Sequence, residues 1–131
     1  MRGVLAILAA GGLLLCAAPP ARSEASHKGD TETYKAMITL TATIRHGDNS
    51  RGVLSVQAGL DTPDPKLRTL ADQSAPRLRD AYVRALSVYA AGLSPGASPN
   101  VDQIAQQLQR ATDRVLGRPG ARFLLGTVLV N

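Results

Sequence analysis

The clearest structural signal in the chain is the stretch of residues 74–89, which reads SAPRLRDAYVRALSVY. Apolar side chains recur here at 3, 4, 7, 8 and 11 residues after Leu78, the spacing of one face of an α-helix. These residues are Leu78, Ala81, Tyr82, Ala85, Leu86 and Tyr89. Pro76 is tolerated because it falls in the first helical turn. We therefore predict an amphipathic helix whose apolar face packs on a sheet.

A helix is predicted on each side of this stretch. Asp64 followed by Pro65 is typical of an N-cap and a proline at the first helical position. After a loop over residues 92–99, Asn100 and Gln103 have the spacing of a capping pair that opens another helix. Gly117 ends that helix. Its predicted inner stripe consists of Ile104, Ala105, Leu108, Ala111, Thr112 and Val115.

Strands are predicted before and after the helices. Apolar and polar residues alternate over residues 34–45, with Tyr34, Ala36, Ile38, Leu40, Ala42 and Ile44 on one face. A turn over residues 46–50 leads into a second strand that carries Leu54, Val56, Ala58 and Leu60, giving an antiparallel hairpin. Residues 123–130 are almost continuously apolar, as in a strand covered on both faces.

The predicted fold class is therefore α+β, with the order β-β-α-α-α-β. The hairpin and the C-terminal strand form one small sheet, and the helices pack on it. Residues 34–131 make a single domain.

The first 25 residues are typical of a secretory signal. The apolar run from Val4 to Ala18 has 15 residues. As a helix it would span about 22 Å, short of the roughly 30 Å hydrocarbon core of a membrane. Small residues favour cleavage between Ala25 and Ser26, with a second site after Ser23. Residues 26–33 form a flexible lead. The alternative is an N-terminal membrane anchor that is not cleaved.

Export predicts a periplasmic domain, either released or tethered to the inner membrane. Removal of Arg2, Arg22 and Glu24 leaves 13 basic and 9 acidic side chains, a net charge of +4. Aromatic residues make up 3% of the chain, too few to stack nucleic-acid bases. Nucleic acid is therefore not expected as a partner.

Catalytic groups are scarce in the predicted domain. Cys16, the one cysteine, lies in the signal. His27 and His46 lie in the lead and in a turn, and neither has the spacing of a metal ligand set. Asp61 and Asp64 are explained by turn formation and capping. We predict no enzymatic activity, no catalytic residues, no metal site and no cofactor.

Arginines mark the predicted outer faces of two helices. Arg110, Arg114 and Arg118 are four residues apart, so they lie on one side of the third helix and just beyond its end. Arg77, Arg79 and Arg84 lie on the outer side of the second helix, where Arg84 can pair with Asp80. Two interpretations follow. The arginines form a solvated face, or they form a basic docking surface for an acidic protein or anionic lipid.

Four segments together form a pattern of element order and of proline-plus-charge motifs. They are Leu60-Asp61 leading to Asp64-Pro65-Lys66-Leu67, Pro76-Arg77-Leu78-Arg79-Asp80-Ala81, Ile104 through Leu108 to Leu116 and Gly117, and Leu124 to Val130. This pattern resembles the periplasmic domain of the FliL family of flagellar basal-body proteins, and the resemblance covers residues 51–131.

The resemblance implies a stomatin-like fold without enzymatic activity. It also implies a membrane-associated protein that binds the flagellar stator, supports flagellum-dependent motility and forms homo-oligomers. The expected function is thus protein binding by a FliL-like domain in the periplasm or at the inner membrane. The alternative is a free periplasmic binding module of unrelated role that uses the arginine surface.

Overall fold

The structure, a computed structural model, describes residues 33–131. The predicted signal, its cleavage site between Ala25 and Ser26, and residues 26–32 of the lead lie outside this range. The described elements, in chain order, are β1 (Tyr34–Ala36), β2 (Leu40–Arg45), β3 (Arg51–Asp61), α1 (Pro65–Gln73), α2 (Ala75–Gly92), α3 (Val101–Leu116) and β4 (Arg122–Val130).

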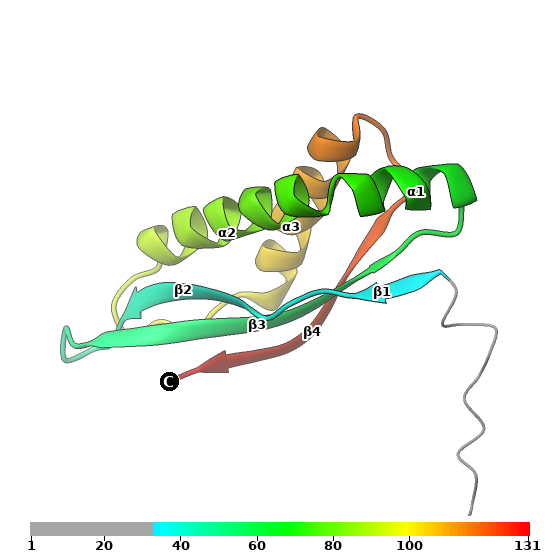
Figure 1. Cartoon of the computed structure of the whole chain (residues 1–131). Helices are drawn as coiled ribbons and strands as arrows, with labels where there is room; N and C mark the ends of the chain where they lie inside the picture. The colour runs from blue at the N-terminus through cyan, green and yellow to red at the C-terminus, as the bar shows by residue number, and fades with distance from the viewer. Residues whose placement is uncertain (1–32) are drawn as a thin grey trace, which may run out of the picture.

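The strands form one antiparallel sheet with β3 at its centre. β1 and β2 pair with successive parts of one edge of β3, and β4 pairs with the other edge. The helices cover one face of this sheet, and no described element covers the other face (Figure 1). The α+β class and the sheet made of a hairpin plus a C-terminal strand are therefore confirmed.

The prediction of one strand over residues 34–45 was wrong, because the segment forms two strands. Ala36 pairs with Gly59 and Leu40 pairs with Val56. The first segment therefore advances four residues where β3 advances three. One extra residue reverses the side-chain alternation. Leu40 is buried as predicted, whereas Ile38 is exposed. The observed order is consequently β-β-β-α-α-α-β.

The C-terminal strand is present, but it is not covered on both faces as predicted. Phe123 is buried against the core, whereas Leu124 and Leu129 are 36% and 52% exposed. The helices cover only one face of the sheet, and β4 lies at its edge (Figure 1). A continuously apolar strand can therefore be covered on one face only, as β4 is.

The apolar face of α2 forms the centre of the core, as predicted. Leu78, Tyr82, Leu86 and Tyr89 are all buried. The Tyr82 ring packs edge-on against Phe123, with 5.2 Å between the ring centroids. Its hydroxyl lies 2.6 Å from Thr112 Oγ1. Because Thr112 Oγ1 donates to the Leu108 carbonyl at 2.9 Å, Tyr82 is the donor in the first bond. One side chain thus joins α2 to α3 and β4.

The predicted helix ends are also confirmed. Asp64 Oδ1 accepts a hydrogen bond from the Lys66 backbone N–H at 2.9 Å, and Asn100 Oδ1 accepts one from Gln103 N–H at 3.0 Å. The Asn100 N–H donates to the Tyr89 hydroxyl at 2.6 Å and not to the Gln103 side chain, so only the Asn100 half of the predicted capping pair is formed. Ser74 separates α1 from α2. Gly117 has a φ of 75°, a left-handed conformation that ends α3 at low steric cost. These local contacts fix where α2 and α3 begin and end, and so where their outer side chains lie.

Candidate functional site

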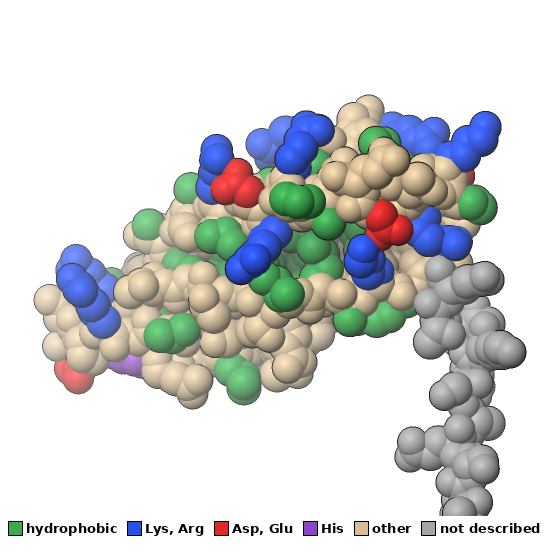
Figure 2. Space-filling model, in the orientation of Figure 1, with side chains coloured by type: hydrophobic (Ala, Val, Ile, Leu, Met, Phe, Trp, Pro, Cys, Tyr) green, Lys and Arg blue, Asp and Glu red, His purple; other side chains and the backbone are tan. Residues whose placement is uncertain are grey.

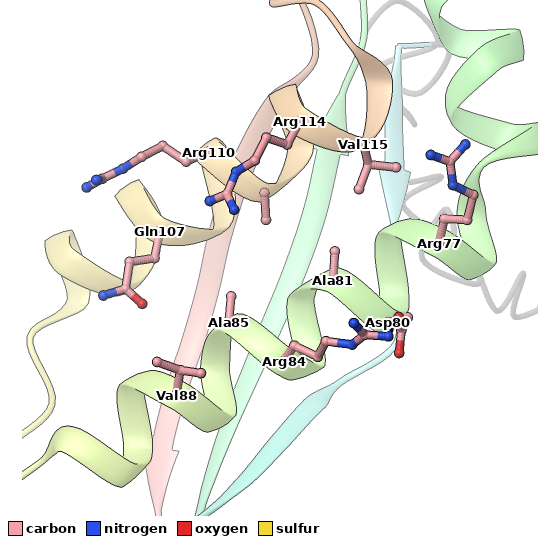
Figure 3. A pocket seen from close by; sticks show the side chains of 11 residues that line it. Arg77, Asp80, Ala81, Arg84, Ala85, Val88, Gln107, Arg110, Arg114 and Val115 are labelled. Atoms are coloured by element: carbon pink, nitrogen blue, oxygen red, sulfur yellow. Dashed lines mark hydrogen bonds and ion pairs between the residues drawn. The ribbon is translucent and has the colours of Figure 1, made fainter.

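A groove of about 750 Å³ lies between α2 and α3 on the outer surface of the helix layer. The two helices run in opposite directions along its walls (Figure 3). Its lining combines a small apolar floor with a charged rim. The lining residues are Arg77, Asp80, Ala81, Arg84, Ala85, Val88, Gln107, Arg110, Ala111, Arg114 and Val115.

The floor of the groove consists mainly of small side chains. Ala81 and Ala85 of α2 point toward α3, and Val115 of α3 points toward α2 (Figure 3). All three are half-buried, whereas Val88 at the end of the groove is 72% exposed. Helical periodicity predicted Ala81, Ala85 and Val115 on the inner stripes of their helices. These positions lie at the borders of the stripes, which is why they are shared between the core and the groove.

Four predicted site residues lie along the rim of this groove. Arg77 and Arg84 come from α2, and Arg110 and Arg114 come from α3. All four side chains are exposed. Figure 2 shows further that lysine and arginine side chains gather over the helix layer. Packing of the two helices thus combines two arginine sets that are 26 or more residues apart in the sequence.

The arginines of the groove are poorly neutralised by the residues that the structure describes. Asp80 is the one carboxylate in the lining, and it pairs with Arg84 at 2.6 Å. Among residues 33–131, Arg77, Arg110 and Arg114 form no ion pair. The other three ion pairs lie elsewhere and join Lys35 to Asp72, Arg118 to Asp64, and Arg122 to Asp61. Four guanidinium groups against one carboxylate leave the groove strongly positive.

Arg118, the fifth predicted site residue, is not part of this groove. Its guanidinium donates to Asp64 Oδ2 at 3.0 Å, and so connects the end of α3 to the start of α1. The two residues are 54 positions apart, so their contact could not be read from the helical spacing. Arg110 and Arg114 therefore border the groove beside α2, whereas Arg118 is directed toward α1.

A second hollow, of about 620 Å³, lies where the break between β1 and β2 faces the start of α2. Met37, Ile38 and Val83 contribute apolar lining to it. Figure 2 shows this apolar hollow between the helix layer and the sheet edge. The alternating pattern did not predict this hollow, because it placed Ile38 on the inner face of a continuous strand.

The described acidic and histidine side chains do not converge on a metal site. Residues 33–131 contain no group of three or more His, Cys, Asp or Glu side chains placed to hold an ion. Asp48 lies in the predicted turn. A hydrogen bond from the Ser50 hydroxyl at 2.6 Å, together with one from its backbone N–H, holds the pKa of Asp48 below its ordinary value. This aspartate therefore shapes the hairpin turn.

The described part of the chain contains no helix with both the length and the apolar character needed to cross a membrane. Comparison of the chain with protein-family models and with curated proteins finds no match. The arginine groove and the fold are thus the observations on which a functional proposal can rest.

Proposed function

We propose that this protein is a non-enzymatic, extracytoplasmic docking domain that binds an acidic protein through the groove between α2 and α3. The observation that carries the proposal is that Arg77, Arg84, Arg110 and Arg114 lie around an apolar floor. Arginine pairs well with carboxylates because its guanidinium presents a planar fork of donors. It is also enriched in protein interfaces.

Within residues 33–131, three of these arginines form no ion pair, which supports docking over a purely solvated face. Like charges on neighbouring helix walls repel one another, and a bound acidic surface would remove that repulsion. A surface that binds no partner is stabilised more by interspersed opposite charges, such as the pair of Asp80 with Arg84, than by charges of one sign. The groove has one such pair among four arginines.

The FliL resemblance supplies the more specific form of the proposal. A FliL-like domain would be held at the inner membrane, would assemble with further copies and would support the flagellar stator. The supporting observations are the order of helices and the segment around Pro76, Arg77 and Asp80 that opens α2. The alternative is a free periplasmic module of unrelated role that uses the same groove.

Membrane fractionation separates these two forms. Stator support requires that the native protein stay with the inner membrane and that its deletion impair motility. Recovery of the protein only in the released periplasmic fraction, with normal motility of the deletion strain, would leave the free module as the function.

The groove itself is tested by a pull-down from periplasmic and membrane extract. Arg110→Glu with Arg114→Glu should lose the partners that the wild type retains, and wild-type recovery should fall as salt rises, because exposed charges are screened over about 10 Å at 0.1 M. Arg45→Glu with Arg51→Glu is a matched control. It makes the same charge change at an exposed pair beside the hairpin turn. Identical partner lists for wild type and both variants would refute docking through the groove.

A further inference from the structure

We infer that the occupant of the groove between α2 and α3 is an acidic amphipathic α-helix of a partner protein. This inference rests on the proposed function and specifies the shape as well as the charge of the partner. Three properties of the groove lead to it: the kind of element that forms its walls, the size of its floor side chains, and the spacing of its arginines.

Both walls of the groove are helices, and this limits how a partner chain can bind. The backbone groups of α2 and α3 are used within each helix, so the walls offer side chains but no free strand edge. An extended peptide would find no backbone partners and would have to keep its own N–H and C=O groups in water. A helix satisfies its backbone internally and needs only side-chain contacts, as in helix-in-groove recognition.

The floor allows a third helix to approach closely. Ala81, Ala85 and Ala111 are small, and packed helix axes lie about 8–10 Å apart depending on the side chains at the contact. Val88, which is 72% exposed, and Val115 extend the apolar strip toward the two ends. An apolar face of the partner helix would cover this strip and remove Val88 from water.

The arginines repeat along the groove at helical intervals. Arg110 and Arg114 are one turn apart, about 6 Å along the axis, and Arg77 and Arg84 are two turns apart, about 10 Å. Two carboxylates four residues apart on one side of the apolar face of a bound helix would match the spacing of Arg110 and Arg114. Two carboxylates seven residues apart on the other side would match the spacing of Arg77 and Arg84. The stretch from Arg77 to Val88 is about 16 Å long, enough for about three turns of the partner.

The charge of the groove argues for a different protein rather than a second copy of this chain. The helices α2 and α3 together contain five arginines, three aspartates and no glutamate. Their outer faces would therefore place arginine against arginine if one copy docked in the groove of another. Such like-charge contacts oppose association. The partner helix should instead be rich in glutamate or aspartate.

A model peptide tests this inference without knowledge of the natural partner. The probe is a fluorescein-labelled, stapled helix of about 15 residues with a leucine and alanine face flanked by glutamates. Binding to the purified protein is followed by fluorescence anisotropy. The probe should bind about tenfold or more tightly than a scrambled peptide of equal composition, in which the glutamates no longer flank an apolar face. A version with lysine in place of glutamate should not bind.

Two variants separate charge from shape. Arg77→Glu with Arg114→Glu should weaken probe binding about tenfold or more, whereas Arg45→Glu with Arg51→Glu should leave it unchanged. Ala85→Trp changes no charge but fills the floor, so it should also weaken the stapled probe. Vesicles containing anionic phosphatidylglycerol test the lipid alternative, and sedimentation tests self-association.

If the probe and the scrambled peptide bound equally well, the inference that the occupant is an amphipathic helix would be wrong. The proposal of an acidic partner would still stand. The inference would also be overturned if the protein bound the vesicles more strongly than the probe. The same holds if the protein self-associated and Arg77→Glu with Arg114→Glu abolished that self-association. Failure of the pull-down, by contrast, refutes the docking function itself. The two ideas can therefore fail separately.

Discussion

The inner and outer faces of α2 differ sharply within a few residues. Leu86 is 1% exposed, whereas Val88, two positions further along the same helix, is 72% exposed. The inner face is packed by the sheet and α3, so its side chains are constrained by volume. The outer face borders the groove, where, under the proposed function, charge and shape are constrained by the partner. The contrast teaches that stability and the proposed function reside in separable side chains of one helix.

The largest expected effect tests whether this separation is real. Leu86→Ala should lower the free energy of unfolding by about 2–5 kcal/mol, because it removes buried methyl groups and leaves a cavity. Val88→Ala on the outer face should change it by less than about 0.5 kcal/mol. Guanidinium denaturation of both variants measures the difference. Similar losses for the two would mean that the faces of α2 are not distinct in packing.

A smaller effect is expected at the hydroxyl that joins α2 to α3. Tyr82→Phe keeps the ring against Phe123 but removes the hydrogen bond donated to Thr112. The expected loss at neutral pH is about 0.5–1.5 kcal/mol, the usual net contribution of one hydrogen bond. An unchanged denaturation midpoint would show that the buried bond contributes nothing to holding the helices together.

The same variant should also alter the response to alkaline pH. Burial raises the pKa of Tyr82 above its ordinary value of 10.0. The unfolded chain therefore loses this proton at lower pH than the folded chain does, and stability falls as the pH rises from about 10 through the folded pKa. Phenylalanine has no such proton. The stability gap between wild type and Tyr82→Phe should narrow above pH 10, and a constant gap would contradict a buried, protonated hydroxyl.

The smallest expected effect on stability belongs to the groove. Arg110→Glu with Arg114→Glu should change the free energy of unfolding by less than about 0.5 kcal/mol, since both side chains are exposed and neither is in an ion pair within residues 33–131. The measurement is again chemical denaturation, made on the protein used in the pull-down. A loss above about 1 kcal/mol would contradict the separation between packed and groove side chains, because weaker binding in the pull-down could then follow from unfolding.

Most of the elements could be predicted because their signals are local. Asp64, Asn100 and Gly117 set helix ends through contacts with near neighbours, and the period of apolar residues identifies the inner face of α2. The break near Ile38 was missed because apolar and polar residues alternate over residues 34–45 except at Met37, and this one irregularity was not interpreted as a break. Whether a strand continues depends on its register with β3, which the alternation of one strand does not encode.

The candidate site was predictable in part. Helical spacing was enough to place Arg77, Arg84, Arg110 and Arg114 on outer faces of two helices. It could not show that α2 and α3 border one groove, since that depends on how both pack on the sheet. Nor could it show that Arg118 pairs with Asp64, because the contact joins residues that are distant in the chain.

Periodicity, capping residues and composition thus establish the helices, the hairpin, the inner faces and the excess of basic side chains from the amino-acid sequence alone. Packing of the helices on one side of the sheet establishes the rest: the uncovered face of β4, the split of residues 34–45, and the groove. The physical reason is the distance along the chain over which each kind of interaction acts. Local signals act over one or two turns, whereas the groove forms only when side chains such as Tyr82 and Thr112 bring distant segments into contact.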